Sequence, residues 1–379
     1  MLNEYRLLTP GPVQMPPEIL RALGQNMIHH RTPEFEDVLK RCLKNLKAVF
    51  QTQQPVLILP STGSGGMEAA LVNLFSPGDE LLSIVSGKFG ERWSEMAQAF
   101  GLNVTTLNVP WGEAVDPIQV RKHLEQNPRI RGVMTQACET STATLHPVKE
   151  LAEITRESGA LLLVDGITAL GAMDLPMDLW GIDVLVAGSQ KAFMLPTGLA
   201  FIALSERAWE RSVAARCPRF YFDLARERKA NESTQTYFSS SVTLIRALDV
   251  ALNLMLKEGL SSYVRKYTRL AEALRAGGEA LGLKIYSKAP SPSVTAFLVP
   301  DGLDSEKLRL HLERSYRITV MGGQDQLKGK ILRVGTLGYV RPEDILAVVE
   351  ATGQALKDFG FKADTDGAIR RTREALARP

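Results

Sequence analysis

The sequence predicts an α/β fold, with a mostly parallel seven-stranded sheet domain followed by a smaller C-terminal α+β domain. Seven short runs have the length and composition of β-strands, at residues 56–59, 81–85, 104–109, 132–135, 161–164, 184–187 and 199–204. Helix-patterned segments separate most of them, at residues 67–75, 91–100, 118–125 and 148–158. Strands that alternate with helices favour a parallel sheet with helices on both faces. The last two runs are joined by a short loop, so we expect one antiparallel strand.

The pattern changes after residue 205. We expect helices at residues 243–258, 263–281, 305–315 and 342–359, strands at 284–286, 294–299 and 331–334, and a charged surface helix in the tail 364–379. A chain of 379 residues fits one large and one smaller domain. We therefore divide it into an N-terminal segment over the active site (1–15), a large domain (16–258) and a small domain (259–379).

Composition narrows the class of protein. The chain has 45 Lys and Arg against 42 Asp and Glu, and no basic run with interleaved aromatics, which argues against a nucleic-acid partner. No apolar stretch approaches the roughly 20 residues of a membrane span, and no signal peptide is recognised, so we expect no membrane partner. The three cysteines lack CxxC spacing and the five histidines form no metal pattern. Scattered cysteines favour reduced thiols and a cytoplasmic location.

Two of the predicted strands are each followed by one charged residue, Asp165 and Lys191. Ligands of open α/β sheets bind beyond the carboxyl ends of the strands, so these two groups are expected in one crevice. A carboxylate that can face a cationic ring nitrogen, and an amine that can form an imine, suit an enzyme that uses pyridoxal 5'-phosphate (PLP). Taken singly, the Asp fits a helix cap or an ion pair, and the Lys fits a solvated side chain.

The segment Gly188-Ser189-Gln190-Lys191 resembles the lysine motif of the class V aminotransferases, and the resemblance extends over roughly residues 5 to 357. It is nearest to the alanine–glyoxylate and serine–glyoxylate (or serine–pyruvate) branch. It implies the type I PLP-dependent transferase fold, with Lys191 holding PLP, Asp165 facing the pyridine nitrogen and Gln190 contacting the phosphate.

The turn before the helix at residues 67–75 is rich in Gly and Ser. A helix N-terminus approached by small residues suits an anion, although this turn matches neither the Walker nor the GxGxxG pattern. The resemblance places Thr62, Gly63 and Ser64 around the PLP phosphate. It also places Phe89, flanked by Gly87 and Gly90, against the pyridine ring, where several family members carry Trp.

Three further segments carry family motifs. The resemblance directs the Thr140 hydroxyl to the phenolic oxygen of PLP, in a motif where Ala143 stands in place of the usual Gly. It directs Tyr237 and a serine across a homodimer interface to the phosphate of the neighbouring subunit, which implies shared active sites. Ser239 and Ser240 are both candidates for that serine, and Ser239 is favoured.

Arg333 lies within an apolar strand pattern. A buried Arg needs an anion, which is either an internal carboxylate or, as the resemblance implies, the substrate carboxylate. Gly11, in Thr9-Pro10-Gly11-Pro12, is expected to approach the substrate closely. His29-His30-Arg31 matches another family segment, but no chemical role follows for it.

We therefore expect a PLP-dependent aminotransferase that moves an amino group from a small amino acid, alanine or serine, to a 2-oxo acid such as glyoxylate or pyruvate. Two alternatives stay open: a 2-aminoethylphosphonate transaminase, and a non-catalytic subunit of a larger complex. A cysteine desulfurase is disfavoured because no cysteine lies in the C-terminal part. A nucleotide-binding protein would need phosphate and ribose signatures that the chain lacks.

Overall fold

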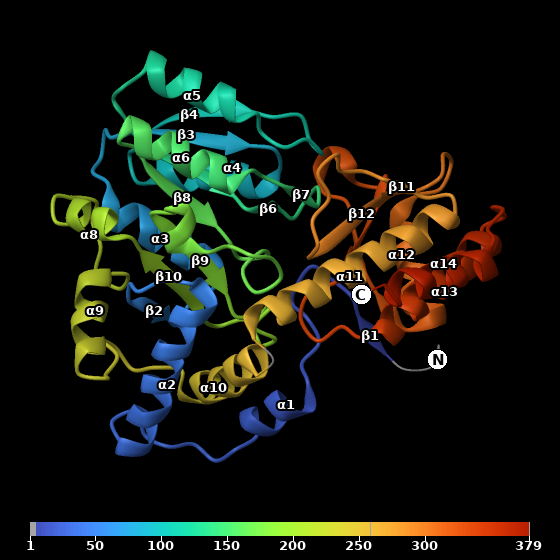
Figure 1. The fold of residues 1–379 in the computed structure, drawn as a ribbon, viewed down its shortest axis with the longest axis horizontal. Coiled ribbons are helices and arrows are strands. Elements are labelled where there is room, and N and C mark those ends of the chain that lie inside the picture. Colours follow the sequence, from blue (N-terminus) through green and yellow to red (C-terminus); the bar gives the residue numbers. More distant parts are fainter. Residues whose placement is uncertain (1–4, 258, 379) are drawn as a thin grey trace.

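The seven predicted strands form one sheet in a computed structural model, which describes residues 5–257 and 259–378 (Figure 1). In spatial order these are β2 (Val56–Leu59), β10 (Ala200–Leu204), β9 (Val184–Gly188), β8 (Leu161–Asp165), β5 (Ile130–Gln136), β3 (Glu80–Val85) and β4 (Asn103–Asn108). β10 runs antiparallel to β2 and β9, and the other pairs are parallel. The predicted sheet and its one antiparallel strand are therefore confirmed. The segment 1–4 and the boundary residues 258 and 379 of the predicted domains lie outside the described residues.

Helices cover both faces of this sheet, which explains why four of its strands are buried along their whole length. One face packs against α3 (Gly63–Leu74) and α4 (Lys88–Ala99). The other packs against α5 (Pro117–Gln126), α6 (Val148–Ser158) and the helices α2 (Pro33–Phe50) and α10 (Val242–Leu256). The predicted helices are confirmed, with α3 and α4 beginning three or more residues earlier than expected. α2 was not predicted; the hydroxyl of Thr32 caps it by accepting from the Phe35 N–H.

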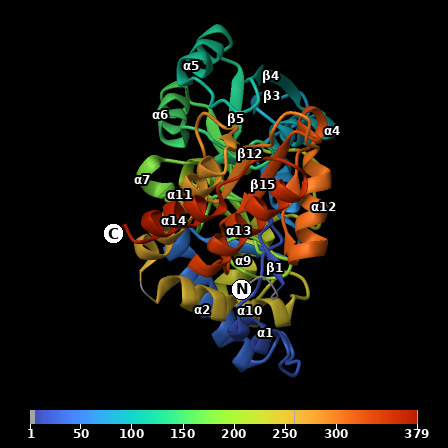
Figure 2. The same cartoon turned by 90° about the vertical axis from the view of Figure 1, so that its right-hand side faces the viewer.

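The C-terminal part has its own antiparallel sheet, in the order β11 (Lys284–Ile285), β12 (Val294–Leu298), β15 (Ile331–Gly335) and β14 (Met321–Gly322). Figure 2 shows the helices α11 (Leu260–Ala280), α13 (Pro342–Asp358) and α14 (Thr365–Leu376) in front of the larger sheet, with α12 (Ser305–Tyr316) at one side. The three predicted strands are present. β14 was missed because two residues carry no periodic signal.

The N-terminal segment belongs to this smaller part. β1 (Arg6–Leu7) pairs in parallel with β13 (Ile318–Thr319), and Leu8 and Val13 lie in the same hydrophobic cluster as Tyr267. The chain is thereby led past the carboxyl ends of β8 and β9 before it enters the large sheet domain. The division at residues 15 and 258 stays a prediction.

The remaining elements are short: α1 (Pro17–Leu23), β6 (Cys138–Glu139), β7 (Thr144–Leu145), α7 (Met177–Trp180), α8 (Glu206–Ser212), α9 (Leu224–Glu232) and the 3-10 helix η1 (Asp325–Leu327). No described helix combines the length and the apolar character that crossing a membrane requires.

Candidate active site

Lys191 lies just past the end of β9, and the N-terminal segment covers it. Its Nζ donates to the carbonyl of Pro10. Gly11 has φ +108°, and a Cβ built at Gly11 would lie 2.5 Å from Nζ of Lys191. Glycine is therefore required here both by the backbone conformation and by the close approach of the amine. Burial lowers the pKa of Lys191 to about 8; the charge of Arg333 acts in the same direction and that of Asp165 opposes it.

Asp165 is the last residue of β8 and is 5% exposed. Its Oδ1 accepts from the N–H of Ile167 at 2.8 Å. Burial raises its pKa to about 7, the Ile167 N–H opposes this, and the charge of Glu139 adds to it while Lys191 opposes it. The Ile167 N–H and Lys191 compensate only part of the cost of burying the charged carboxylate. A cationic partner such as a protonated ring nitrogen would therefore stabilise its charged form.

The Gly/Ser-rich turn is the first turn of α3. Thr62 is the N-cap without a side-chain cap bond, so Gly63 and Ser64 occupy the first helical positions. The first N–H groups of a helix lack intrahelical partners and favour an anion. Gln190, just beyond β9, adds a side-chain NH2 group that can donate to an anion. These groups suit a phosphate.

Phe89 is held by a network centred on Glu139. The Oε2 of this buried carboxylate accepts from the N–H groups of Phe89 and Gly90, each at 3.1 Å, and its Oε1 accepts from the N–H and hydroxyl of Ser141. A Cβ at Gly87 would collide with Glu139 and Ser141, and one at Gly90 would meet the carbonyl oxygen of Ile84 at 2.6 Å.

The glycines that flank Phe89 make room for the Glu139 side chain and for β3. Phe89 itself is half-buried within the first turn of α4 rather than in a loop after the strand.

Thr140 follows Glu139 and is 4% exposed. Its hydroxyl donates to the hydroxyl of Thr168 at 2.7 Å, and its carbonyl accepts from Arg333. Ala143 adopts φ +59°, the left-handed conformation that the usual Gly would adopt without strain. The loop thus keeps that conformation at a cost of about 1–2 kcal/mol.

Arg333 lies in β15 and is 6% exposed. Its Nε donates to the carbonyl of Gly322 at 2.8 Å and its Nη1 to that of Thr140 at 3.0 Å. No carboxylate of residues 5–257 or 259–378 lies within ion-pair distance of it, so the internal salt bridge considered above is wrong. Burial lowers its pKa to about 10, and Glu139 and Glu306 oppose this shift. A buried cation that two carbonyls hold in place is suited to binding an incoming carboxylate.

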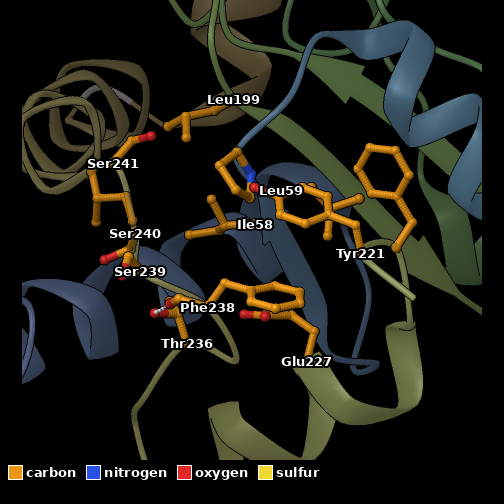
Figure 3. Close-up of a pocket in the computed structure, with 13 residues that line it drawn as sticks. Ile58, Leu59, Leu199, Tyr221, Glu227, Thr236, Phe238, Ser239, Ser240 and Ser241 are labelled. Atoms are coloured by element: carbon orange, nitrogen blue, oxygen red, sulfur yellow. Dashed lines mark hydrogen bonds between the residues drawn. The ribbon is translucent and has the colours of Figure 1, made fainter.

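The segment that carries Tyr237 and Ser239 lines a small pocket beside β2. Figure 3 shows Ser239, Ser240 and Ser241 along one wall of a small pocket, which also touches the loop after β2. The hydroxyl of Tyr237 accepts from Arg226 at 2.6 Å, Ser239 is exposed, and Oγ of Ser240 is buried without a partner. Within the described residues, neither Tyr237 nor Ser239 hydrogen-bonds to another predicted site residue.

Three residues at the site had no predicted role: Arg92, Glu139 and Thr168. Arg92 donates from Nη1 to Oγ of Ser64 at 3.2 Å. The sequence spacing could have indicated that Arg92 belongs to the site. In a helix that begins at Lys88, Phe89 and Arg92 are three positions apart and lie on one face. Starting the helix at residue 91 concealed that relationship.

The grouped residues fit PLP. A buried carboxylate, an amine with a lowered pKa, an aromatic ring, the Gln190 amide and a helix N-terminus lie around the carboxyl ends of β8 and β9. Fold and site together define a PLP-dependent transferase of the type I fold.

The chain belongs to the class-V aminotransferases, whose family model matches residues 15–347. It is 34% identical to an L-aspartate–glyoxylate aminotransferase of Paracoccus denitrificans, over 99% of this chain and 96% of that protein. It is 39% identical to a soluble hydrogenase 42 kDa subunit of Anabaena cylindrica, over 97% of each. A crystal structure of an alanine–glyoxylate aminotransferase from Nostoc sp. superposes with a TM-score of 0.90 at 32% identity, covering 93% of this chain and 96% of that one. The chain is thus a PLP-dependent transaminase.

Proposed function

We propose that this transaminase takes the amino group of a small amino acid, alanine or serine, and passes it to glyoxylate or pyruvate. The observation that carries the proposal is Arg333, a buried guanidinium without a carboxylate partner in the described chain, whose charge contributes to the lowered pKa of Lys191. Relatives named as alanine–glyoxylate and aspartate–glyoxylate aminotransferases support glyoxylate as the acceptor.

The side chains divide the work by their chemistry. Arg333 binds the carboxylate of the amino or keto acid and so orients its Cα. Lys191, with a pKa of about 8, is partly neutral near neutral pH and can take up and return the proton of Cα. Asp165 favours a protonated ring nitrogen, and the bound cofactor supplies the electron sink for the carbanion. Thr62, Gly63, Ser64 and Gln190 hold the phosphate, Phe89 lies against the ring, and the Thr140 hydroxyl faces its phenolic oxygen.

The test follows the visible absorption band of the bound cofactor as amino donors are added to the purified enzyme, beside a Lys191→Ala variant. L-Alanine or L-serine is expected to bleach the band, and glyoxylate to restore it. L-Aspartate and 2-aminoethylphosphonate are tested in parallel. Bleaching by 2-aminoethylphosphonate with no response to alanine or serine would replace our donor with the aminophosphonate alternative. No band in the presence of PLP would refute the cofactor site itself.

The shared active site of a homodimer is part of this proposal. It is supported by the exposure of Ser239, by the lack of a hydrogen bond from Tyr237 or Ser239 to another predicted site residue within the described chain, and by the exposed aromatic residues Phe220 and Tyr221. Arg31 fixes this segment by donating to the carbonyl of Thr236. Three buried, unpaired cysteines support a cytoplasmic location.

Co-expression of a Lys191→Ala chain with a Tyr237→Ala, Ser239→Ala chain tests the dimer. Mixed dimers have one intact site, so random pairing should restore about a quarter of wild-type activity. Two inactive chains that remain inactive together would show that Tyr237 and Ser239 act within their own subunit.

The hydrogenase name of the Anabaena relative favours one other role, that of a subunit in a larger complex. A non-catalytic subunit has no chemical need for Asp165, Gln190, Lys191 and Arg333, and the presence of all four therefore favours the transaminase. A purified chain that binds PLP but bleaches with none of the four donors would favour the subunit role.

A further inference from the structure

Arg92 brings a positive charge to the start of α3. It is exposed on α4, its Nη1 donates to the Ser64 hydroxyl at 3.2 Å, and its Cζ lies 4.8 Å from the centroid of the Phe89 ring. Its charge also lowers the pKa values of Asp165 and Lys191, behind the larger effects of burial. These contacts place the guanidinium between the turn predicted to hold phosphate and the ring predicted to stack on the cofactor.

The predicted phosphate site lacks a cation without Arg92. Its six assigned residues are all neutral: Thr62, Gly63, Ser64, Gln190, Tyr237 and Ser239. A phosphate monoester carries about two negative charges near neutral pH, whereas a helix N-terminus offers about half a positive charge. The site as assigned would leave most of that charge uncompensated.

The positive charge of Arg92 is available to bind a phosphate. In the described part of the chain no Asp or Glu lies within ion-pair distance of it. Only Nη1 is engaged, by a neutral hydroxyl. A guanidinium presents five donors in a planar fork, so it can retain Ser64 and bind a phosphate oxygen at the same time.

We propose that Arg92 is a phosphate-binding residue of this enzyme, which holds Ser64 with one nitrogen and the 5'-phosphate of the cofactor with the other. The proposal rests on the placement of the phosphate at the α3 N-terminus made under the proposed function. The cation–π contact gives Arg92 a second effect, because a guanidinium held on Phe89 restricts that ring.

The test compares PLP with pyridoxal, which lacks the phosphate, in binding to the cofactor-free enzyme. Arg92→Gln should weaken PLP binding about 10- to 100-fold, as expected for one charge-assisted hydrogen bond, and leave pyridoxal binding unchanged. Inorganic phosphate should compete with PLP in the wild type and much less in the variant. Arg92→Lys should recover part of the affinity.

Arg129→Gln is the matched control, since Arg129 is a surface arginine on the loop before β5, paired with Glu80. Equal loss of PLP and pyridoxal binding would overturn the proposal and leave Arg92 a support for Phe89. PLP binding equal to wild type would also overturn it. Failure of the wild-type protein to bind PLP at all would instead refute the proposed function. Thermal unfolding of each variant checks that the fold is intact.

Discussion

Gly11 lies directly against the side chain of Lys191, although the two residues are far apart in the sequence. The carbonyl of Pro10 accepts from Nζ of Lys191, and Gly11 has φ +108°. The N-terminal segment therefore limits the volume in which the amine can move. Since β1 ties this segment to β13 of the small sheet domain, the position of the amine depends on both parts of the chain.

Gly11→Ala should impair the enzyme at the amine rather than unfold it. The new methyl would stand within 2.5 Å of Nζ and displace the end of a flexible side chain. We expect PLP capture by the cofactor-free enzyme to slow by about 10-fold or more, as misplacement of a reacting group costs up to about 100-fold. Stopped-flow absorbance measures this rate.

Gly159→Ala is the control for that variant. Gly159 has φ +80°, but a Cβ there would meet nothing within 4 Å. It therefore reports the backbone strain alone, about 1–2 kcal/mol. If both variants capture PLP at the wild-type rate, Gly11 is needed only for its backbone conformation.

Glu139→Gln should destabilise the loop that carries Thr140 and the turn that carries Phe89. An amide cannot accept at its NH2, so two of the four donors now satisfied by Glu139 would face another donor. The expected loss of unfolding free energy is about 2–4 kcal/mol. Urea unfolding of the cofactor-free enzyme measures it.

Ser141→Ala removes one donor to Glu139 and the acceptor of the Lys88 N–H, and should cost about 1–2 kcal/mol. A Glu139→Gln variant no less stable than Ser141→Ala would contradict the view that the carboxylate organises both segments. Burial raises the pKa of Glu139, while the N–H and O–H donors of Ser141, Gly90 and Phe89 oppose the shift.

Arg333→Lys should raise KM for the amino donor more than it lowers kcat. Lysine keeps the charge but loses the fork that contacts Gly322, Thr140 and, as we propose, the substrate carboxylate. Loss of a charge-assisted hydrogen bond corresponds to about a 10- to 100-fold rise in KM. Steady-state kinetics with L-alanine and glyoxylate give both constants.

The cofactor band should be retained in Arg333→Lys, because the residue is assigned to substrate and not to PLP. A fall in kcat with KM unchanged would show that Arg333 acts in another way than binding the carboxylate.

The large sheet could be predicted because four of its strands are apolar runs buried along their whole length, and helical segments separate most of the strands in the sequence. Asp165 and Lys191 could be placed in one crevice for the same reason, since both follow neighbouring parallel strands. The position of Phe89 relative to its strand was only approximate, because helix boundaries are weakly marked by periodicity.

The contacts that complete the site join distant segments and had no local signal. Pro10 and Lys191 are 181 positions apart, and Arg333 and Thr140 are 193 apart. The two-residue strands β1 and β13, which bring the N-terminal segment into place, are too short for any periodic pattern. Such contacts follow from tertiary packing and not from the residues nearby.

Asp165→Asn should remove a pH dependence from the stability of the cofactor-free enzyme. Burial raises the pKa of Asp165 from 3.8 to about 7, so the folded chain holds a proton that the unfolded chain has already lost in that range. This contribution to stability is complete below about pH 4 and is lost as pH rises to about 7. At about pH 7.5 the cofactor-free variant should therefore be more stable than wild type, by up to about 4 kcal/mol.

Urea unfolding of the cofactor-free proteins at about pH 4 and about pH 7.5 measures the difference, with the exposed Asp301→Asn as control. In the presence of PLP at about pH 7.5, wild type should instead be more stable than Asp165→Asn. A ligand stabilises most strongly the protein that binds it best, and the neutral amide lacks the attraction of a carboxylate to a protonated ring nitrogen. A variant that gains as much stability from PLP as wild type would show that Asp165 is not the partner of that nitrogen.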